Sequence, residues 1–260
     1  DGTFELSDVP FYSQVKRIKD DKTMQETGTR INKYMSQCGY CSRREADRLI
    51  EKGEVWINGT LATMGTKVMP GDTVMVHHTT ITPCQKEYLL AFHKPAGIVC
   101  TTSKIDKNNV IDYLNFPERI YPVGRLDKES TGLLLLTNNG QLMDDILRGS
   151  NYHEKEYIVH VNKPITDSVL QAMAQGVPIL DTITRPCKIR RMGKDCFYIT
   201  LTQGLNRQMC EYFDYRVTSL KRIRIMNIEL GSLPVGKWRE LTTSEIKTLK
   251  NLAQNKGEAE

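Results

Sequence analysis

Residues 121–140 read YPVGRLDKESTGLLLLTNNG and constrain the fold more than any other part of the chain. The unbroken leucine run 133–136 predicts a strand that is buried on both faces, because a half-exposed strand would alternate apolar and polar residues. Arg125 and Asp127 stand just before this run in a polar loop. Since a loop anchored by a buried strand can hold a side chain rigidly, Asp127 is the first candidate catalytic residue.

The composition is that of a globular protein with room for more than one domain. The chain has 260 residues, enough for one small and one larger domain, with 39% hydrophobic and 26% charged residues. Its formal net charge of +5 permits a polyanionic partner but does not require one. No apolar run approaches the length of a membrane span, so we expect no membrane partner.

The cysteines indicate a reducing environment. Their number, seven, is odd and they are scattered, which disfavours a secreted disulfide framework and favours a cytoplasmic protein. Cys38 and Cys41 have metal-like spacing, but no second cysteine or histidine pair follows at the spacing of a zinc site. We therefore expect two thiols there and no metal. Residues 1–28 lack sustained periodicity and predict a flexible leader.

Residues 29–77 predict a small module of two helices and a hairpin. Ile31, Tyr34 and Met35 share one helical face, and the capping box that begins at Ser42 starts a second helix. Asn58 and Gly59 predict a type I′ hairpin turn. The sequence R-I-N-K-Y at its start and the block C-S-R-R-E-A-D resemble the S4 RNA-binding domain.

The S4 resemblance implies that basic side chains of this module contact RNA phosphates, which positions RNA without reading its sequence. On charge alone the same residues would be a solvated helix face, since acidic residues nearby balance them. The candidate RNA-binding residues are Arg30, Lys33, Arg43, Arg44 and Arg48.

The remaining chain predicts a linker and a larger domain. Residues 78–87 are polar and threonine-rich, as linkers are, whereas residues 88–252 alternate short strands with few helices. Residues 253–260 predict a flexible tail. The fold class is therefore α+β, with a small S4-type domain followed by a domain with a mixed, mainly antiparallel sheet.

Four motifs in this larger domain resemble those of the pseudouridine synthases of the ribosomal small- and large-subunit branch, in the same order. They are His93-Lys-Pro-Ala-Gly97, Gly124-Arg-Leu-Asp127, Lys155-Glu-Tyr157 and Gly204-Leu-Asn-Arg-Gln208. The resemblance is greatest to the F-type 23S rRNA enzymes, with the B-type, E-type and small-subunit enzymes as alternatives. It implies that Asp127 and Tyr157 are catalytic. It also implies a base-flipping pocket formed by Arg125, Leu126, Leu220 and Arg207, and further RNA contacts from Lys94, Lys221, Arg222 and Arg224.

The implied reaction breaks the bond from ribose C1′ to uracil N1, turns the base and joins C1′ to C5. The reaction is an isomerisation without net gain or loss of atoms and without electron transfer, so the resemblance implies no cofactor. Asp127 would attack C1′ or remove a sugar proton, and the sequence leaves both open. Arg125 would fill the space that the flipped uridine vacates. Tyr157 would pack against the uracil and assist proton removal from C5.

One departure from the family follows Gln208. Relatives continue with an apolar residue and two arginines, one of which pairs with the catalytic Asp, whereas here Gln208 runs directly into Met209. Three helical residues correspond to about 4.5 Å of rise, so Arg207 can replace the lost arginine only from an altered register. The alternative to an active enzyme is an impaired RNA-binding or ribosome-assembly factor of the same fold.

The implied substrate is a uridine of 23S rRNA, free or in the assembling large ribosomal subunit, with a tRNA loop as a second candidate. RNA shape selects such sites, and short motifs do not encode it. Because no heptad pattern or long unexplained apolar surface is visible, the sequence predicts a monomer.

Overall fold

The computed structural model describes residues 28–254 except 104, 149–151 and 180–181. Its contacts divide the chain into two compact units, with the boundary between Cys84 and Gln85. Almost all of the predicted leader lies outside the described residues. The predicted tail does too, except that the last helix continues to Gln254, because Ala253 is buried in the core of the second unit.

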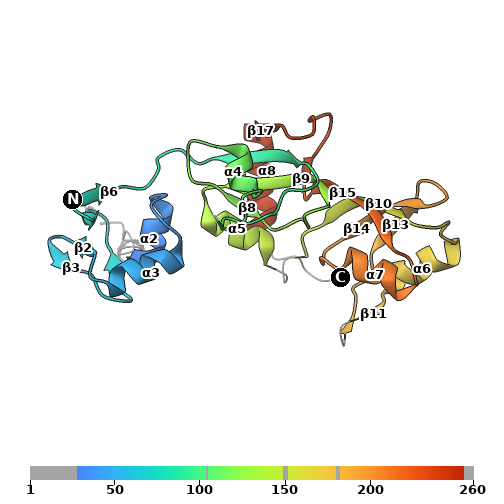
Figure 1. Ribbon diagram of the computed structural model, residues 1–260, viewed down its shortest axis with the longest axis horizontal. Helices are drawn as coiled ribbons and strands as arrows, with labels where there is room; N and C mark the ends of the chain where they lie inside the picture. Colours follow the sequence, from blue (N-terminus) through green and yellow to red (C-terminus); the bar gives the residue numbers. More distant parts are fainter. Residues whose placement is uncertain (1–27, 104, 149–151, 180–181, 255–260) are drawn as a thin grey trace, which may run out of the picture. The chain divides into compact units, whose positions relative to one another are not determined.

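Two helices and short strands around one apolar core make up the first unit (Figure 1). Four strands pair in the order β3-β2-β5-β6, and β1 pairs separately with β4. The elements are β1 (Thr29–Arg30), α2 (Ile31–Gln37), α3 (Arg43–Glu51), β2 (Val55–Ile57), β3 (Thr60–Leu61), β4 (Lys67–Val68), β5 (Val74–Val76) and β6 (Thr79–Ile81).

Local signals explain these elements. The Ser42 hydroxyl accepts a hydrogen bond from the Glu45 amide at 3.1 Å, which caps α3 as predicted. Asn58 and Gly59 have φ values of 49° and 79°, as a type I′ turn requires. The predicted linker 78–87 is wrong in its first part, because Thr79–Ile81 forms β6 and pairs with β5.

The second unit is built on a nine-stranded sheet. The main order is β13-β14-β10-β15-β9-β7-β17, with β8 paired to β9 and β16 paired to β15. The strands are β7 (Leu89–Lys94), β8 (Tyr121–Val123), β9 (Thr131–Thr137), β10 (Lys155–Val161), β13 (Lys188–Arg191), β14 (Cys196–Leu201), β15 (Val217–Ile225), β16 (Ile228–Glu229) and β17 (Trp238–Glu240), while β11 (Pro178–Ile179) and β12 (Thr182–Ile183) form a separate pair.

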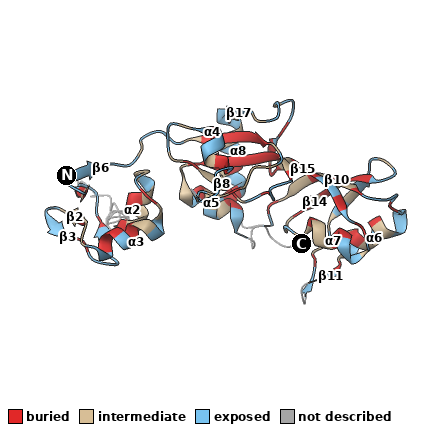
Figure 2. Ribbon diagram, in the orientation of Figure 1, coloured by how far each residue is buried: buried red, intermediate tan, exposed pale blue. Residues whose placement is uncertain are grey.

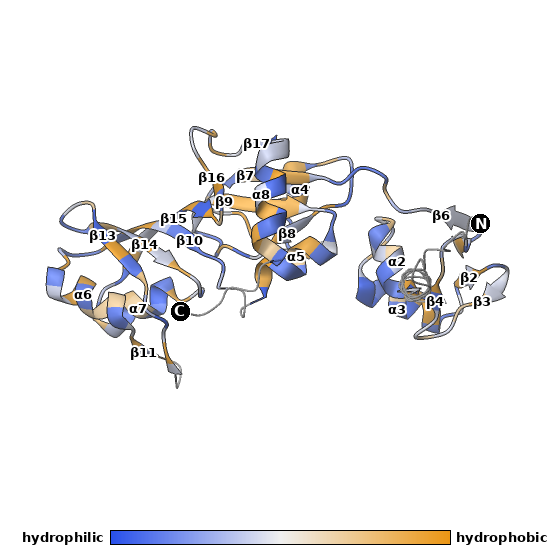
Figure 3. Cartoon of the chain, turned by 180° about the vertical axis from the view of Figure 1, so that it is seen from behind, coloured by the Kyte–Doolittle hydropathy of each residue, from blue (hydrophilic) through white to orange (hydrophobic). Residues whose placement is uncertain are grey.

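Helices cover both faces of the central strands, which lie between them in Figure 2. The helices are α4 (Val110–Leu114), α5 (Gly140–Leu147), α6 (Asp167–Gln175), α7 (Asn206–Tyr212) and α8 (Thr243–Gln254). On β9, Leu134 and Leu136 belong to the core with α4, α6 and α7, whereas Leu133 and Leu135 belong to the core with α5 and α8. The strand is therefore buried on both faces, as predicted, and its apolar colour in Figure 3 reflects this.

Helix α5 begins at Gly140, directly after Asn139. The Asn139 side chain accepts hydrogen bonds from the amides of Gln141 and Leu142, so this residue caps the helix. The predicted α+β class and the mainly antiparallel sheet are confirmed.

One edge of β9 is divided between two strands. Strand β7 pairs with β9 along its whole length and occupies one edge. On the other edge, β8 pairs with residues 135–137, whereas β15 pairs in parallel with Thr131 and Gly132. The loop that carries Asp127 leaves β8 and enters β9 at this fork. The fork therefore fixes where the loop begins and ends.

Gly132→Ala is expected to lower the free energy of unfolding by about 3 kcal/mol or more. A Cβ at this residue would overlap the Arg222 carbonyl oxygen and lie 2.7 Å from the Arg222 nitrogen, and the φ of +102° disfavours any side chain. Gly140→Ala in α5 is the control, since its Cβ would meet no atom within 4 Å. Urea denaturation of both variants gives the comparison, and equal stabilities would contradict the close β9–β15 approach.

Candidate active site

Asp127 lies in the loop between β8 and β9, as the sequence predicts. The loop turns tightly there, with the Ser130 amide donating to the Asp127 carbonyl at 3.1 Å. The Asp127 side chain is 67% exposed, so a ligand can reach the carboxylate. Leu126 points the other way and is buried in the core. Its amide donates to Cys100 Sγ at 3.4 Å.

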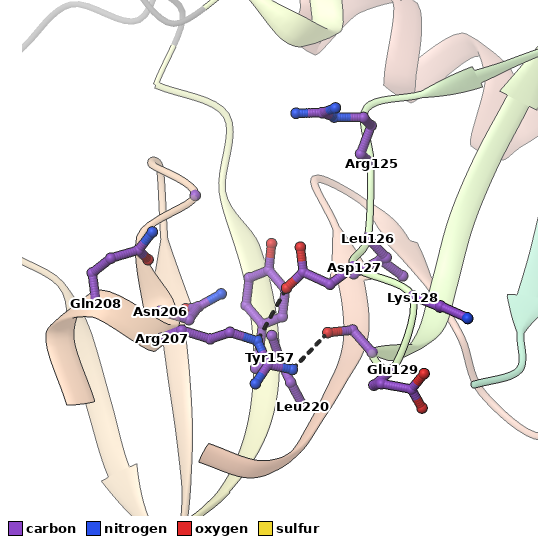
Figure 4. A pocket seen from close by; sticks show the side chains of 12 residues that line it. Arg125, Leu126, Asp127, Lys128, Glu129, Tyr157, Asn206, Arg207, Gln208 and Leu220 are labelled. Atoms are coloured by element: carbon purple, nitrogen blue, oxygen red, sulfur yellow. Dashed lines mark hydrogen bonds and ion pairs between the residues drawn. The ribbon is translucent and has the colours of Figure 1, made fainter. Parts of the chain in front are cut away.

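A cavity of about 500 Å³ opens beside this loop. It brings together the loop that carries Asp127, β10, β15 and the start of α7, which are distant in sequence (Figure 4). The lining residues are Arg125, Leu126, Asp127, Lys128, Glu129, Ser130, Tyr157, Gly204, Asn206, Arg207, Gln208 and Leu220. All the residues predicted for catalysis and for the base-flipping pocket are therefore in one place.

Arg207 pairs with Asp127 across the cavity. Its Nε donates to Asp127 Oδ2 at 3.0 Å, and its Nη2 donates to the Ser130 hydroxyl at 3.2 Å (Figure 4). Arg207 is the second residue of α7, which has only seven residues. Arg207 thus supplies a guanidinium to the carboxylate that, by the family resemblance, a later arginine was expected to bind.

Tyr157 and Leu220 form the apolar side of the cavity. Tyr157 is 4% exposed and lies on β10 where a register shift between Glu156 and Tyr157 interrupts its pairing with β15. Such a bulge changes the direction in which a side chain points. Leu220 on β15 is also buried. Arg125 is exposed at the rim, and its guanidinium extends away from the Asp127–Arg207 pair (Figure 4).

Lys94 does not fit the predicted RNA contact. Its side chain is fully buried, so RNA cannot reach it. The ammonium donates to the carbonyl oxygens of Pro95, Lys128 and Ser130 at 2.8–3.0 Å. Burial lowers the pKa of Lys94 below its ordinary value of 10.5, because removal from water disfavours the charged form. Lys94 instead holds the loop that carries Asp127.

Arg222 and Arg224 are likewise occupied within the fold. Arg222 is 2% exposed and donates to backbone carbonyls, which excludes a phosphate contact. Arg224 pairs with Glu156 and Glu154 at 3.0 and 3.1 Å. The predicted RNA contacts of these two arginines are therefore corrected, because the sequence did not show that β15 runs through the interior of the sheet. Lys221 is half-buried and stays a candidate.

In the first unit, the predicted RNA-binding side chains are accessible. Arg30, Arg43, Arg44 and Arg48 are exposed and Lys33 is half-buried. Arg48 pairs with Glu45 on the helix surface at 3.0 Å. Because such a surface ion pair is weak, it leaves Arg48 free to contact a phosphate.

Sequence reasoning did not single out five polar residues of the cavity, which are Lys128, Glu129, Ser130, Asn206 and Gln208. Ser130 accepts the second hydrogen bond of Arg207, and Gln208 and Asn206 come from α7. Asn206 is 6% exposed, and its Oδ1 has no hydrogen-bond partner within the described part of the chain. Asn206 and Gln208 belong to the Gly204–Gln208 motif, and the other three residues directly follow Asp127 in the chain, so their place in or beside a motif was the signal that could have found them.

Within the described ranges, no group of three or more histidine, cysteine, aspartate or glutamate side chains is arranged to hold a metal ion. No helix described here is long and apolar enough to cross a membrane.

The Cys38 thiol has a pKa raised to about 11 by burial, and Tyr34 is hydrogen-bonded to it.

Comparisons with known proteins match both units. Residues 88–210 match the RNA pseudouridylate synthase family and residues 29–74 match the S4 domain. The chain is 51% identical over 234 residues to the dual-specificity RNA pseudouridine synthase RluF of Salmonella typhi, covering 88% of this chain and 81% of that protein. It is 32% identical to the ribosomal large subunit pseudouridine synthase B of Bacillus subtilis, covering 87% and 97%.

A solved structure shares the fold. A crystal structure of a pseudouridylate synthase superimposes with a TM-score of 0.62 at 27% identity and covers 85% of this chain and 99% of that one. The two matched regions define the class of protein, an RNA-modifying enzyme with an RNA-binding module. The chain belongs to the RNA pseudouridine synthase family, in the branch that carries an N-terminal S4 domain.

Arg207→Met is expected to lower kcat for pseudouridine formation about 100-fold, because Asp127 loses the guanidinium that orients it. Stability should change by less than about 1 kcal/mol, since the pair is solvent-exposed. Arg207→Lys should recover part of the rate. Arg216→Met, at another exposed arginine, is the control. Single-turnover kinetics and urea denaturation measure both effects, and an unchanged rate for Arg207→Met would show that Arg207 does not replace the lost arginine.

Proposed function

We propose that this protein is a catalytically competent pseudouridine synthase in which Asp127 acts on the ribose of the target uridine. The single observation that carries the proposal is the 3.0 Å pair between Arg207 Nε and Asp127 Oδ2. The main objection to activity is that the arginine expected after Gln208, which would pair with Asp127, is missing from the sequence. The Arg207–Asp127 pair answers this objection. The impaired RNA-binding factor is therefore the second candidate.

The geometry suggests a division of roles in the cavity. Arg207 binds Oδ2, so Oδ1 is the oxygen that we assign to C1′ or to the neighbouring sugar proton. The C1′–N1 bond breaks, the uracil turns, and the C1′–C5 bond forms before the proton on C5 leaves. Tyr157, with Leu220 beside it, provides an apolar surface against which the uracil ring can pack.

Arg125 is suited to base flipping. Its side chain is exposed at the cavity rim and free to enter a helix from which the uridine has left. The planar guanidinium can stack on neighbouring bases and contact phosphate at the same time. Removing a base from its stack costs a few kcal/mol, which such an insertion would partly offset.

The proposed substrate is a uridine of 23S rRNA in the large ribosomal subunit, with a tRNA loop as a second target. The similarity to a dual-specificity RNA pseudouridine synthase and to a ribosomal large subunit enzyme supports this. We propose that the protein acts as a cytoplasmic monomer. The free cysteines of the described chain agree with a reducing compartment.

Asp127→Asn is expected to abolish tritium release from 5-tritiated uridine in 23S rRNA transcripts while RNA affinity stays within about twofold, because the amide cannot act as nucleophile or base. Asp214→Asn is the matched control, since Asp214 is an exposed aspartate with its own cation, Lys163. Release by wild type and the control alone would establish the function. No release from any of them, with RNA still bound, would favour the binding factor.

Arg43→Ala combined with Arg44→Ala is expected to weaken RNA binding and to reduce the slope of log K against log salt by about 1.5–2, since each arginine would release about one counterion. Both side chains are exposed on α3. Lys247→Ala, exposed on α8 in the second unit, is the control. Filter binding at several salt concentrations measures the slope. A slope equal to that of wild type would remove these arginines from the RNA interface.

A further inference from the structure

The fork on the edge of β9 leaves a gap in the backbone hydrogen bonding. Strand β15 pairs with β9 at only two positions, Lys221 opposite Thr131 and Arg222 opposite Gly132. Strand β8 takes the same edge from Leu135 onward. Between these pairings, at Leu133, a main-chain carbonyl needs a donor that neither strand supplies.

The Arg222 side chain fills this gap. Its Nε donates to the Leu133 carbonyl at 2.7 Å, and its Nη1 donates to the Arg125 carbonyl at 3.4 Å. Leu133 lies at the start of β9 and Arg125 lies just after β8, on either side of Asp127. One guanidinium thus joins the two ends of the loop that carries the catalytic carboxylate.

Arg222 also contacts the other side of the cavity. Tyr157 is its cross-strand partner on β10, at the register shift. The guanidinium carbon lies 6.0 Å from the centroid of the Tyr157 ring, at the outer limit of a cation–π contact. The loop with Asp127 and the ring that faces the uracil therefore have one neighbour in common.

The electrostatic setting of Arg222 differs from that of a residue needed only for sheet stability. Arg224, two residues further along β15, has two carboxylates as partners. The hydrogen bonds of Arg222 in the described chain go to neutral carbonyls, and its Nη2 is buried without a partner there. A buried cation without a paired anion is costly, so an apolar side chain would stabilise the strand better.

We propose that Arg222 is a positioning residue for pseudouridine formation, which holds both ends of the catalytic loop and the Tyr157 ring in one arrangement. The inference rests on the proposed function of Asp127. Arg222 does not touch the substrate, because it is buried and does not line the cavity. It acts through its hydrogen bond to the Arg125 carbonyl, and hence on the backbone from Arg125 to Asp127.

The test compares Arg222→Ala and Arg222→Lys with Arg239→Met, which removes a partly buried arginine that pairs with Glu245 away from the cavity. We expect Arg222→Ala to lower kcat about 100-fold, with KM and RNA affinity within about threefold of wild type. Guanidinium at millimolar concentration, far below denaturing levels, should raise the kcat of Arg222→Ala at least tenfold, because the ion can occupy the vacated space. Arg222→Lys should stay folded but slow, because one ammonium cannot reach both carbonyls in the same directions.

The control should lose stability and keep its kcat. Equal kcat for wild type and both Arg222 variants would overturn the proposal. A loss of rate that only follows the unfolded fraction, without guanidinium rescue, would also overturn it. If Arg222→Ala does not fold, the kcat of Arg222→Lys decides in the same way.

Hydrogen exchange separates this proposal from the proposed function. The amides of Leu126 and Ser130, which are hydrogen-bonded in the loop, should exchange at least tenfold faster in the Arg222 variants and not in Arg239→Met. If the Arg222 variants exchange faster but the wild type releases no tritium, the positioning role of Arg222 is supported and the proposed function is refuted. If exchange is unchanged and the wild type is active, only the positioning role is refuted.

Discussion

The close approach of β9 and β15 at Gly132 is the contact on which the rest of the second unit depends. It is the only parallel strand pairing in the described sheet, and it joins the β7–β9 half to the β10–β15 half. Because a Cβ would collide with the Arg222 backbone, glycine is required there. The same contact sets the fork from which the Asp127 loop emerges, so the packing of the sheet and the position of Asp127 have one physical origin.

In this site, the shortened segment after Gln208 is compensated by a neighbouring side chain, without a change of fold. Helix α7 is brief, and its second residue, Arg207, reaches the carboxylate that the family resemblance assigns to a later arginine. A guanidinium on a long flexible stem can cover a displacement of several ångströms, whereas a rigid ring could not. The Ser130 hydroxyl adds a second acceptor, and this fixes the plane of the guanidinium relative to Asp127.

The sequence predicted much of this structure because its signals are local. The leucine run gave β9, the capping box at Ser42 gave α3, and Asn58-Gly59 gave the first hairpin. It was wrong where an outcome depends on neighbours distant in the chain. Lys94, Arg222 and Arg224 were assigned to RNA from charge and motif position, yet Lys94 and Arg222 are buried and Arg224 is bound to two glutamates.

By itself the sequence determined the fold class, the family motifs and the identity of the central carboxylate, since these depend on residue type and spacing along the chain. Only the tertiary structure decided which cations stay accessible and which are buried against the loop, and that Arg207 pairs with Asp127. Those outcomes depend on burial and on distances between side chains of segments some 80 residues apart. A pattern along the sequence does not contain these distances.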